Sequence, residues 1–428
     1  MKFFRTFGAL MMMGARAHAQ WEIDISNTIV KDRKRQILLC LLIIPIIIGG
    51  IAMADSLGGE LPDILGGKKA YSPAFFTPGI FIASILIGMG AGLITGCIGA
   101  GGGFIIAPAL MSAGIKGILA VGTDLFHIFA KAIMGSVIHK KLGNISVPLA
   151  LYFLVGAILG GTGGGVINRW LYNINPVLSD TFITTIYVLM LGILGAYALT
   201  DFLRARSSRN QKDFHGAAIE ELDMGNLPAR IQSIQIPPMV TFDQGLVPGG
   251  RKVSSIFLIL CGGLVGFCAS IMGVGGGFLT FPIFVYVLGV SSMTTVGTDI
   301  FQIIFTAGYS AITQYAVYGF IFYTMAIGML LGSLFGIQIG AMVTKVVDGI
   351  TIRGFYAMAV LAGFVNRAFA LPGKLAEMDI ISMPRSITSV LNSIGVWAFF
   401  IVIAIFSIWV VGTFFKNLDK LRGKEETC

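Results

Sequence analysis

The chain has 428 residues, of which 55% are hydrophobic and only 12% are charged. Soluble proteins carry about 25% charged residues, so this composition excludes an ordinary soluble domain and indicates a membrane protein. The net charge of +9 does not point to nucleic acid, because many basic residues stand in short clusters at the ends of apolar runs, where they orient a membrane protein.

The N-terminal part of the chain, 1–75, is expected to hold a surface helix, one membrane span and an outer loop. Residues 2–20 imitate a signal peptide, with two basic residues, a short apolar stretch and Ala17-His18-Ala19. The basic cluster Lys31–Arg35 precedes the first long apolar run, at 36–54, and should stay in the cytoplasm. We therefore expect residues 1–20 to remain uncleaved and to lie on the inner surface of the membrane as an amphipathic helix.

The next part of the chain, 76–201, is a first series of apolar runs. A spanning helix needs about 20 apolar residues. The series begins with a block at 76–138 that is interrupted at Gly99–Gly103 and near Gly114–Gly117, and it continues with spans at 146–167 and 179–200.

A polar segment, 202–253, separates this series from a second one. Its stretch Ile231–Phe242 has β-branched residues and a Pro-Pro pair, which suits either a small ordered cytoplasmic cap or a flexible linker. The second series, 254–386, repeats the pattern of the first, with an interrupted block at 254–316 and two further spans. A final span and a basic tail, 387–428, end the chain. The expected spans after the block are 319–343, 351–371 and 388–414.

Two motifs recur in these series. Gly99-Ala-Gly-Gly-Gly-Phe104 with Pro108 in the first series returns in the second as Gly273-Val-Gly-Gly-Gly-Phe278 with Pro282. Val121-Gly-Thr-Asp124 returns at nearly the same offset as Val296-Gly-Thr-Asp299. A duplicated unit that breaks its helix in the membrane and then carries a buried acid is typical of a transporter built from two halves.

The basic clusters predict opposite orientations for the two halves. They place His139–Lys141, the 202–253 segment and Arg353 in the cytoplasm, together with both chain termini. The first half then starts outside and the second inside. We therefore predict an all-α polytopic membrane protein with inverted-topology repeats and broken or re-entrant helices. Each interrupted block is either a helical hairpin followed by one full span, or three short crossings.

The glycine breaks are the first candidate binding site. Irregular backbone inside a bilayer is tolerated where it is buried in protein or lines a water-filled cavity, and a helix that restarts after a break attracts an anion to its first N–H groups. The competing interpretation is that these glycines only allow tight helix packing. The breaks do not match a dinucleotide-binding or ATP-binding loop. The candidate residues are Gly99, Gly101, Gly102, Gly103, Pro108, Gly273, Gly275, Gly276, Gly277 and Pro282.

The paired acids are the second candidate. An unpaired acid at the centre of a membrane helix costs about 2.5–3.5 kcal/mol, so Asp124 and Asp299 are candidates to carry protons or bind a cation. The alternative is that each aspartate caps the start of a helix beside Thr123 or Thr298, threonines that we also include among candidate substrate contacts.

The first half adds a histidine and a lysine to its acid. Asp124, His127 and Lys131 share one helix face by their spacing. The second half has Gln302 and Thr306 in their place, which are polar but uncharged. Lys131 could neutralise the acid, attract an anion or extend to the inner surface. A histidine can change charge near neutral pH, although a lone one is more often simply hydrogen-bonded.

The paired glycine motifs, each followed by Val-Gly-Thr-Asp, resemble the TauE/SafE sulfite exporter family, also called the 4-toluene sulfonate uptake permease family. The resemblance covers about 76–201 and 254–415. It implies a secondary transporter of sulfur-containing anions such as sulfite and organosulfonates, with substrate contact near the glycine breaks and the helices that follow them. The 202–253 insert and the extra spans at each end exceed a minimal member.

These observations predict a permease for small sulfur-containing anions in a bacterial inner membrane, linked to the proton-motive force through Asp124, Asp299, His127 and Lys131, with no cofactor and no metal. The alternative is a cation transporter with Asp124 and Asp299 as ligands. A membrane enzyme is disfavoured, because only His127 among the four histidines falls within an expected span and no cysteine pair has the spacing of metal ligands. The sequence leaves the oligomeric state open.

Overall fold

The computed structural model describes residues 78–98, 102–141, 145–208, 226–243, 250–344, 346–347 and 349–417. The expected surface helix and first span therefore lie outside the described residues. The same is true of Gly99, Gly101 and the end of the basic tail.

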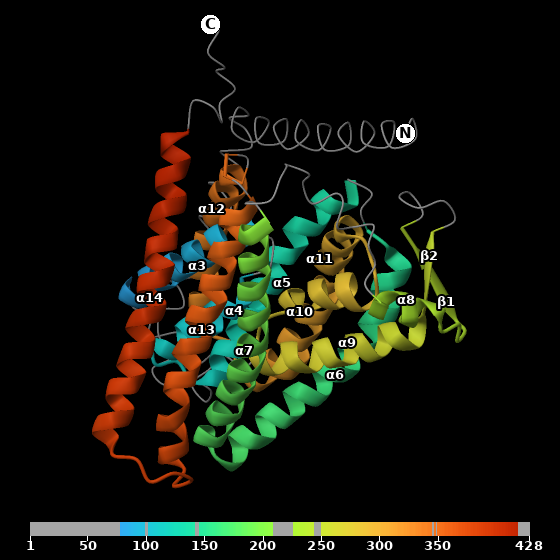
Figure 1. Cartoon of the computed structure of the whole chain (residues 1–428). Helices are drawn as coiled ribbons and strands as arrows, with labels where there is room; N and C mark the ends of the chain where they lie inside the picture. Colours follow the sequence, from blue (N-terminus) through green and yellow to red (C-terminus); the bar gives the residue numbers. More distant parts are fainter. Residues whose placement is uncertain are drawn as a thin grey trace, which may run out of the picture. The chain divides into compact units, whose positions relative to one another are not determined.

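The first series of apolar runs folds, over its described residues, into five helices, which are labelled in Figure 1. The interrupted block becomes three of them, followed by two long helices that match the expected spans. Helix α4 has 10 residues, and at 1.5 Å per residue it is about 15 Å long, too short to cross a hydrocarbon core of about 30 Å. The five helices are α3 (Pro78–Ile98), α4 (Gly103–Ser112), α5 (Gly117–Lys141), α6 (Val147–Ile174) and α7 (Pro176–Ser208).

The second series repeats this order, and one more helix follows it. Its short helix continues into a π-helical segment, Ile283–Val287, and its third helix continues into a second π-helical segment, Ser310–Tyr315, and a 3-10 turn, Ala316–Tyr318. The helices are α9 (Ser255–Met272), α10 (Gly277–Pro282), α11 (Ser292–Tyr309), α12 (Tyr323–Val343) and α13 (Gly349–Glu377), and then α14 (Arg385–Lys416).

Seven of the described helices are long and apolar enough to cross a membrane, namely α3, α6, α7, α9, α12, α13 and α14. The prediction of an all-α polytopic membrane protein is confirmed. Helices α5 and α11, which contain the paired acids, are not among the seven.

The described part of the polar insert is ordered. It forms α8 (Asn226–Ser233) and a hairpin of β1 (Met239–Phe242) and β2 (Arg251–Ser254), paired antiparallel with Val240 opposite Val253. The buried carboxylate of Asp243 accepts hydrogen bonds from the amide and hydroxyl of Ser291, at 2.9 and 2.8 Å. The hairpin is thereby bonded to the residue that precedes α11.

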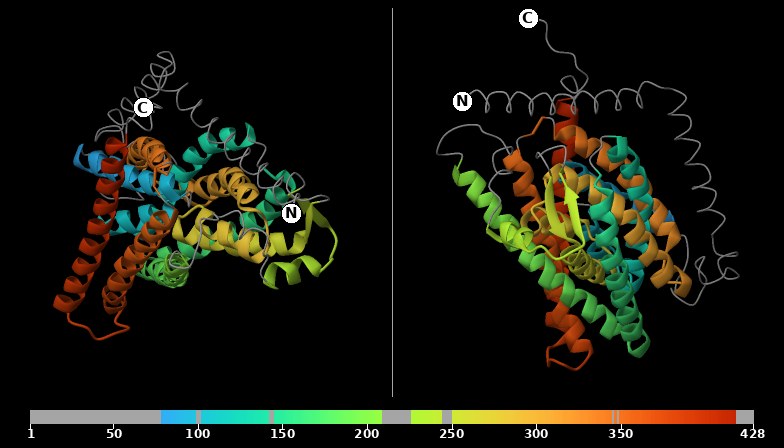
Figure 2. Two further views of the ribbon diagram at one scale, coloured as in Figure 1. Left: turned by 45° about the horizontal axis from the view of Figure 1, so that its top comes forward. Right: turned by 90° about the vertical axis from the view of Figure 1, so that its right-hand side faces the viewer.

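The two series exchange packing partners. Helix α3 packs along α12, and its counterpart α9 packs along α6, the counterpart of α12. The equivalent helices α7 and α13 pack against each other, as do α5 and α11. Figure 1 shows α6 beside α9 and α7 beside α13, and Figure 2 gives two further views of the same arrangement. Such an exchange is the pattern that a pseudo-two-fold axis between inverted repeats produces.

Glycines make the exchanged pairs possible. A Cβ atom on Gly156 of α6 would lie 1.9 Å from the carbonyl oxygen of Ile259 in α9, and one on Gly332 of α12 would lie 2.0 Å from that of Ile85 in α3. These backbones therefore touch without side chains between them, as small residues allow in membrane helices. Glycines therefore do allow tight helix packing in the pairs α6–α9 and α3–α12. These glycines are not the ones in the two breaks.

Candidate functional site

The residues at the breaks adopt backbone conformations that favour glycine. Gly102, directly before α4, has a φ of 65°. In the second half Gly273, Gly275 and Gly276 have φ angles of 78°, 69° and 94°. Positive φ is costly for residues with a Cβ atom, so the glycines end one helix and start the next without strain.

The two breaks meet inside the protein. A Cβ atom on Gly103 would lie 3.0 Å from the backbone of Val274, the second residue of the other motif. The rings of Phe104 and Phe278, the last residues of the two motifs, have centroids 6.2 Å apart. Two segments that lie far apart in the sequence, one in each half, are therefore neighbours in the fold.

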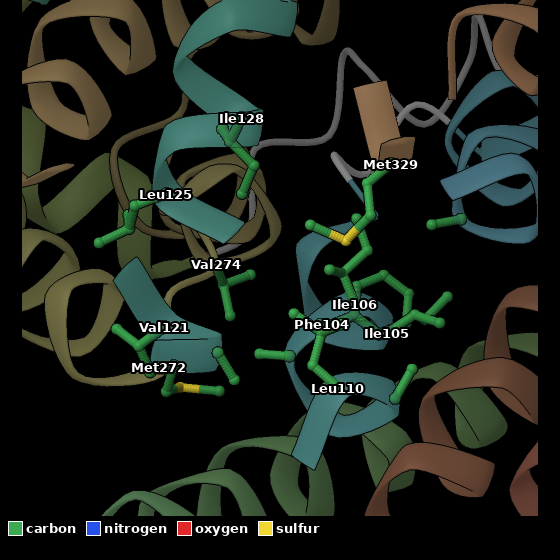
Figure 3. Close-up of a cluster of buried hydrophobic side chains, with 14 of the residues drawn as sticks. Phe104, Ile105, Ile106, Leu110, Val121, Leu125, Ile128, Met272, Val274 and Met329 are labelled. Atoms are coloured by element: carbon green, nitrogen blue, oxygen red, sulfur yellow. The ribbon is translucent and has the colours of Figure 1, made fainter. Parts of the chain in front are cut away.

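Apolar side chains surround this meeting point. Figure 3 shows Phe104, Ile128 and Val274 within a buried cluster that α4, α5 and the second break contribute to. Each of these three side chains is less than 5% exposed. The contact between the breaks is thus closed in this structure.

Both acids lie well inside their helices. Helix α5 begins at Gly117 and α11 at Ser292, so Asp124 and Asp299 each occupy the eighth helical position. The interpretation that they cap a helix start is therefore wrong. The residue that caps α11 is Ser291, whose hydroxyl oxygen accepts a hydrogen bond from the amide of Thr294.

In the first half, Asp124 belongs to a fully buried polar chain. Nδ1 of His127 lies 3.4 Å from Oδ1 of Asp124, and Nε2 of His127 lies 2.9 Å from Oγ of Ser333 in α12. The second carboxyl oxygen, Oδ2 of Asp124, is buried and forms no hydrogen bond of full geometry among the described residues, although the Ala107 backbone and Lys131 act on the carboxylate. An unpartnered buried oxygen is costly, and it marks this acid as a place where a proton or ligand would be accommodated. Lys131 lies further along α5 and is partly buried.

In the second half, neutral groups surround the acid. The amide of Gln302 donates to Oδ1 of Asp299 at 2.9 Å, and the hydroxyl of Thr306 donates to Oε1 of Gln302 at 2.6 Å. A Cβ atom on Gly277 would lie 3.0 Å from Oδ2 of Asp299. The acid therefore lies directly beside the second glycine break.

The paired threonines connect the two halves. The hydroxyl oxygen of Thr123 accepts a hydrogen bond from the amide of Phe322, at 2.9 Å, and that of Thr298 accepts one from the amide of Ser146, at 3.0 Å. Phe322 and Ser146 directly precede the equivalent helices α12 and α6. Both threonines thus have a structural role that follows the pseudo-symmetry of the fold.

A buried arginine adds to the site that the sequence motifs suggested. Arg367 in α13 is 3% exposed. Its Nη2 atom donates to the carbonyl oxygen of Pro108 at 3.2 Å and to the hydroxyl of Ser112 at 2.6 Å, both in α4. No sequence motif singled it out. The signal was a charged residue near the end of the expected span 351–371, where charge is expensive.

Comparison with known proteins gives the family. The model described as "Sulfite exporter TauE/SafE" matches residues 84–366, about two thirds of the chain. The chain belongs to this family. The resemblance that rested on the paired glycine motifs is therefore confirmed, and the protein is a multi-pass membrane transporter, not an enzyme.

Curated relatives agree with this assignment. The chain is 24% identical over 265 residues to "Probable membrane transporter protein YjnA" of Bacillus subtilis (strain 168), a match that covers 61% of this chain and 89% of that protein. It is 23% identical over 280 residues to "Probable membrane transporter protein YunE" of the same organism, 64% and 91% of the two chains. A shorter match is to "Sulfite exporter TauE/SafE family protein 3" of Arabidopsis thaliana. The two proteins are 30% identical over 103 residues, which cover 24% of this chain and 22% of that protein. No solved structure matches the chain significantly.

Proposed function

We propose that this protein exports small sulfur-containing anions, such as sulfite or organosulfonates, across a bacterial inner membrane, and that this transport is linked to the proton-motive force. The observation that carries the proposal is the meeting of the two glycine breaks inside a fold whose family is described as sulfite exporters. Backbone N–H groups freed at the breaks are suitable donors for an anion.

The mechanism rests on the pseudo-symmetry of the halves. Apolar side chains close the contact between the breaks, so an anion reaches their N–H groups only when the halves move apart on one side. Rocking of one half against the other would open the site to each side of the membrane in turn. The glycine backbones, the two prolines of the breaks and Gln302 would line the site.

Proton coupling is assigned to the buried acids. Asp124 with His127, and Asp299 with Gln302, each form a polar pair on a helix beside the breaks. A carboxylate that gains a proton loses its repulsion for an anion nearby. Protonation of the acid and binding of the anion would thereby favour each other, so proton and anion would cross together and a gradient of either one would move the other. Lys131, on the same helix as Asp124, would add attraction for the anion.

The test is flux of radiolabelled sulfite in the direction of export, in proteoliposomes without a pH gradient and with the compartment that sulfite leaves made more acidic. We expect sulfite flux that a pH gradient stimulates and a protonophore abolishes. Liposomes without protein are the control. The absence of any flux with sulfite and with a panel of organosulfonates would rule out the proposed substrate class.

A cation transporter is the second candidate, and the unpartnered Oδ2 of Asp124 favours it. In this case the two acids would be ligands for the cation. Stabilisation of the purified protein by a monovalent or divalent cation, lost in Asp124→Asn and Asp299→Asn, would support the cation transporter over the anion permease.

A further inference from the structure

A large cavity opens beside the first short helix. It has a volume of about 1340 Å³ and lies where the start of α7, the end of α13 and the start of α14 surround the end of α4. These helix ends lie at the bottom of the molecule in Figure 1. The charged residues that line it are Lys116, Asp180, Arg367, Lys374, Glu377, Asp379 and Arg385. The cavity is thus a polar vestibule that leads into a predominantly apolar helix bundle.

Arg367 lies deep in this vestibule. It precedes the last residue of α13, Glu377, by about 15 Å along the helix axis. It is 3% exposed and lines the cavity. A charged side chain at this depth of a membrane protein marks a functional site by default, because burial of the charge is expensive unless something compensates it.

The partners of Arg367 are all neutral. Its Nε atom donates to Oδ1 of Asn366 at 2.7 Å, and its Nη2 atom donates to Pro108 and Ser112 as described above. Among the described residues, its Nη1 atom donates no hydrogen bond and no carboxylate forms an ion pair with the guanidinium. A guanidinium has five N–H donors, so the two on Nη1 are left for a ligand, while Tyr187 and Asp180 act on its charge only through space.

Two of the three acids of the vestibule, Asp180 and Glu377, are engaged elsewhere, and the third, Asp379, is exposed. Oδ1 of Asp180 accepts a hydrogen bond from the amide of Gly117 at 2.8 Å, and Oδ2 lies 3.5 Å from Nζ of Lys374. Nζ of Lys374 is also 3.5 Å from the carboxylate of Glu377. Lys374 thus pairs with two of the acids, and among the described residues Asp180 acts on Arg367 only through space, without forming an ion pair with it.

A second polar side chain in the wall of the vestibule lacks a partner. Thr184 lines the same cavity as Arg367 and is fully buried, and its hydroxyl has no hydrogen-bond partner among the described residues. A buried hydroxyl without a partner costs about 1–3 kcal/mol. Its presence in the wall of a charged cavity is explained if a ligand supplies the missing partner.

We propose that Arg367 and Thr184 bind a small oxyanion at the inner end of this vestibule. Two N–H donors on Nη1 and a hydroxyl suit a sulfite or sulfonate group, whose oxygens can each accept a hydrogen bond, and arginine is the residue that best recognises such oxyanions. The identity of the anion rests on the proposed function, whereas the site itself rests on the cavity, the charge and the unpartnered groups.

The site would exchange the anion with the first break. Arg367 already bonds to Pro108 and Ser112 of α4, the helix that starts at that break. An anion on Arg367 would therefore be held against the element that the proposed transport mechanism requires to move. The vestibule site is an intermediate position between the central site and the aqueous phase.

The experiment compares variants of the full-length protein in two measurements. The variants are Arg367→Gln, Arg367→Lys, Thr184→Val and the control Arg353→Gln, which makes the same change on α13 about 21 Å away. Thermal stabilisation of the purified protein by sulfite, methanesulfonate and sulfate gives an apparent Kd. Flux in proteoliposomes, with sulfite added on the side of the vestibule, gives KM and the maximal rate. The unfolding temperature without anion reports any purely structural effect.

We expect Arg367→Gln to raise the apparent Kd and KM at least tenfold, because hydrogen bonds from a charged group are about twice as strong as neutral ones. Arg367→Lys should lose less affinity than Arg367→Gln, because lysine keeps the positive charge but lacks the planar, two-pronged guanidinium group. Thr184→Val should raise KM less, and Arg353→Gln should leave it unchanged. Ser112→Ala removes one structural bond of Arg367, so it should lower the unfolding temperature and leave the apparent Kd unchanged.

Two results separate this inference from the proposed function. If the wild-type protein transports sulfite and Arg367→Gln and Thr184→Val leave both KM and the apparent Kd unchanged, the vestibule site is wrong and the transport function stands. If no sulfur anion is transported but an anion stabilises the protein only when Arg367 is present, the site stands and the substrate is wrong. Absence of both flux and stabilisation in the wild-type protein overturns both.

Discussion

At the scale of single residues, the two acids differ in what satisfies them. Oδ1 of Asp299 accepts a hydrogen bond from Gln302, a neutral partner that cannot titrate. Asp124 instead faces His127, and its other oxygen forms no hydrogen bond of full geometry among the described residues. The halves have the same acid at the same helical position in different electrostatic surroundings. We therefore expect Asp124 to be the acid that exchanges the coupling proton and Asp299 to be the more static one.

Isosteric neutral variants test this difference. Asp124→Asn should reduce sulfite flux under a pH gradient to the level without a gradient, because its side chain can no longer bind and release a proton. Asp299→Asn should retain at least part of the stimulation by the gradient. Initial rates in proteoliposomes, with and without the gradient, measure both. Equal loss of stimulation in the two variants would show that the halves contribute alike.

The paired threonines make a stability prediction. Thr123→Val and Thr298→Val remove the acceptors of two amides at the starts of α12 and α6. A buried amide without a partner costs about 1–3 kcal/mol, so each variant should unfold at a lower temperature, and Thr298→Val by less because the Ser146 amide is only partly buried. The matched control is Thr200→Val, since the exposed Thr200 hydroxyl bonds only to the carbonyl of Tyr197. Thermal unfolding of the three variants in detergent tests this prediction. Unfolding temperatures equal to that of the wild-type protein in all three would contradict the structural role of Thr123 and Thr298.

At the scale of helices, the apolar runs predicted most of the elements. The expected spans 146–167, 351–371 and 388–414 correspond to α6, α13 and α14, which extend a few residues further. Length and hydropathy suffice there because a membrane requires helices that satisfy their own backbone. The runs did not predict which helices pair. That depends on contacts between residues far apart in the sequence, such as Gly156 and Gly332 with their distant carbonyl groups.

The site divides in the same way. Duplication of the motifs indicated that the two breaks are equivalent, and the structure brings Gly103 against Val274. The duplicated motifs gave no sign of Arg367, because this arginine lies outside them. The cap interpretation of the aspartates was wrong, since it depended on where α5 and α11 begin, and the apolar pattern of a sequence sets such boundaries poorly. Repeats are thus informative about symmetry, and residues that break the symmetry need the structure.

The exchanged helix pairs give an element-scale prediction. Gly156→Ala or Gly332→Ala would place a methyl group about 2 Å from a carbonyl oxygen of the partner helix, so the helices must separate. Overpacking of this kind costs about 1–3 kcal/mol, and both variants should unfold at lower temperature and transport more slowly. Gly163→Ala is the control on α6, because its nearest neighbour would be 3.9 Å away. Wild-type stability in the first two variants would show that these helices pack less closely than described.

At the scale of the whole molecule, the fold combines symmetry with a directional asymmetry. The helices pair as a pseudo-two-fold axis requires, and the threonine bonds follow the same symmetry. The charged groups do not, because His127 is matched by Gln302 and none of the acids described in the vestibule pairs with Arg367. A symmetric scaffold permits two similar states that open to opposite sides. Charged groups that occur in only one half would make the two states unequal, which a transporter with a preferred direction requires.

The inverted orientation of the halves makes the last prediction. The basic clusters place the 202–253 insert inside, and alternation of the spans, against the local charges of Lys374 and Arg385, places the loop between α13 and α14 outside, where it borders the vestibule. Single cysteines at the exposed positions Ser233 and Asp379, in a variant without the five native cysteines, should therefore react from opposite sides. A membrane-impermeant maleimide should label Asp379→Cys in intact cells and Ser233→Cys only after permeabilisation. Labelling of both from the same side would place the vestibule and the insert together, and the halves could then not alternate access in the way proposed.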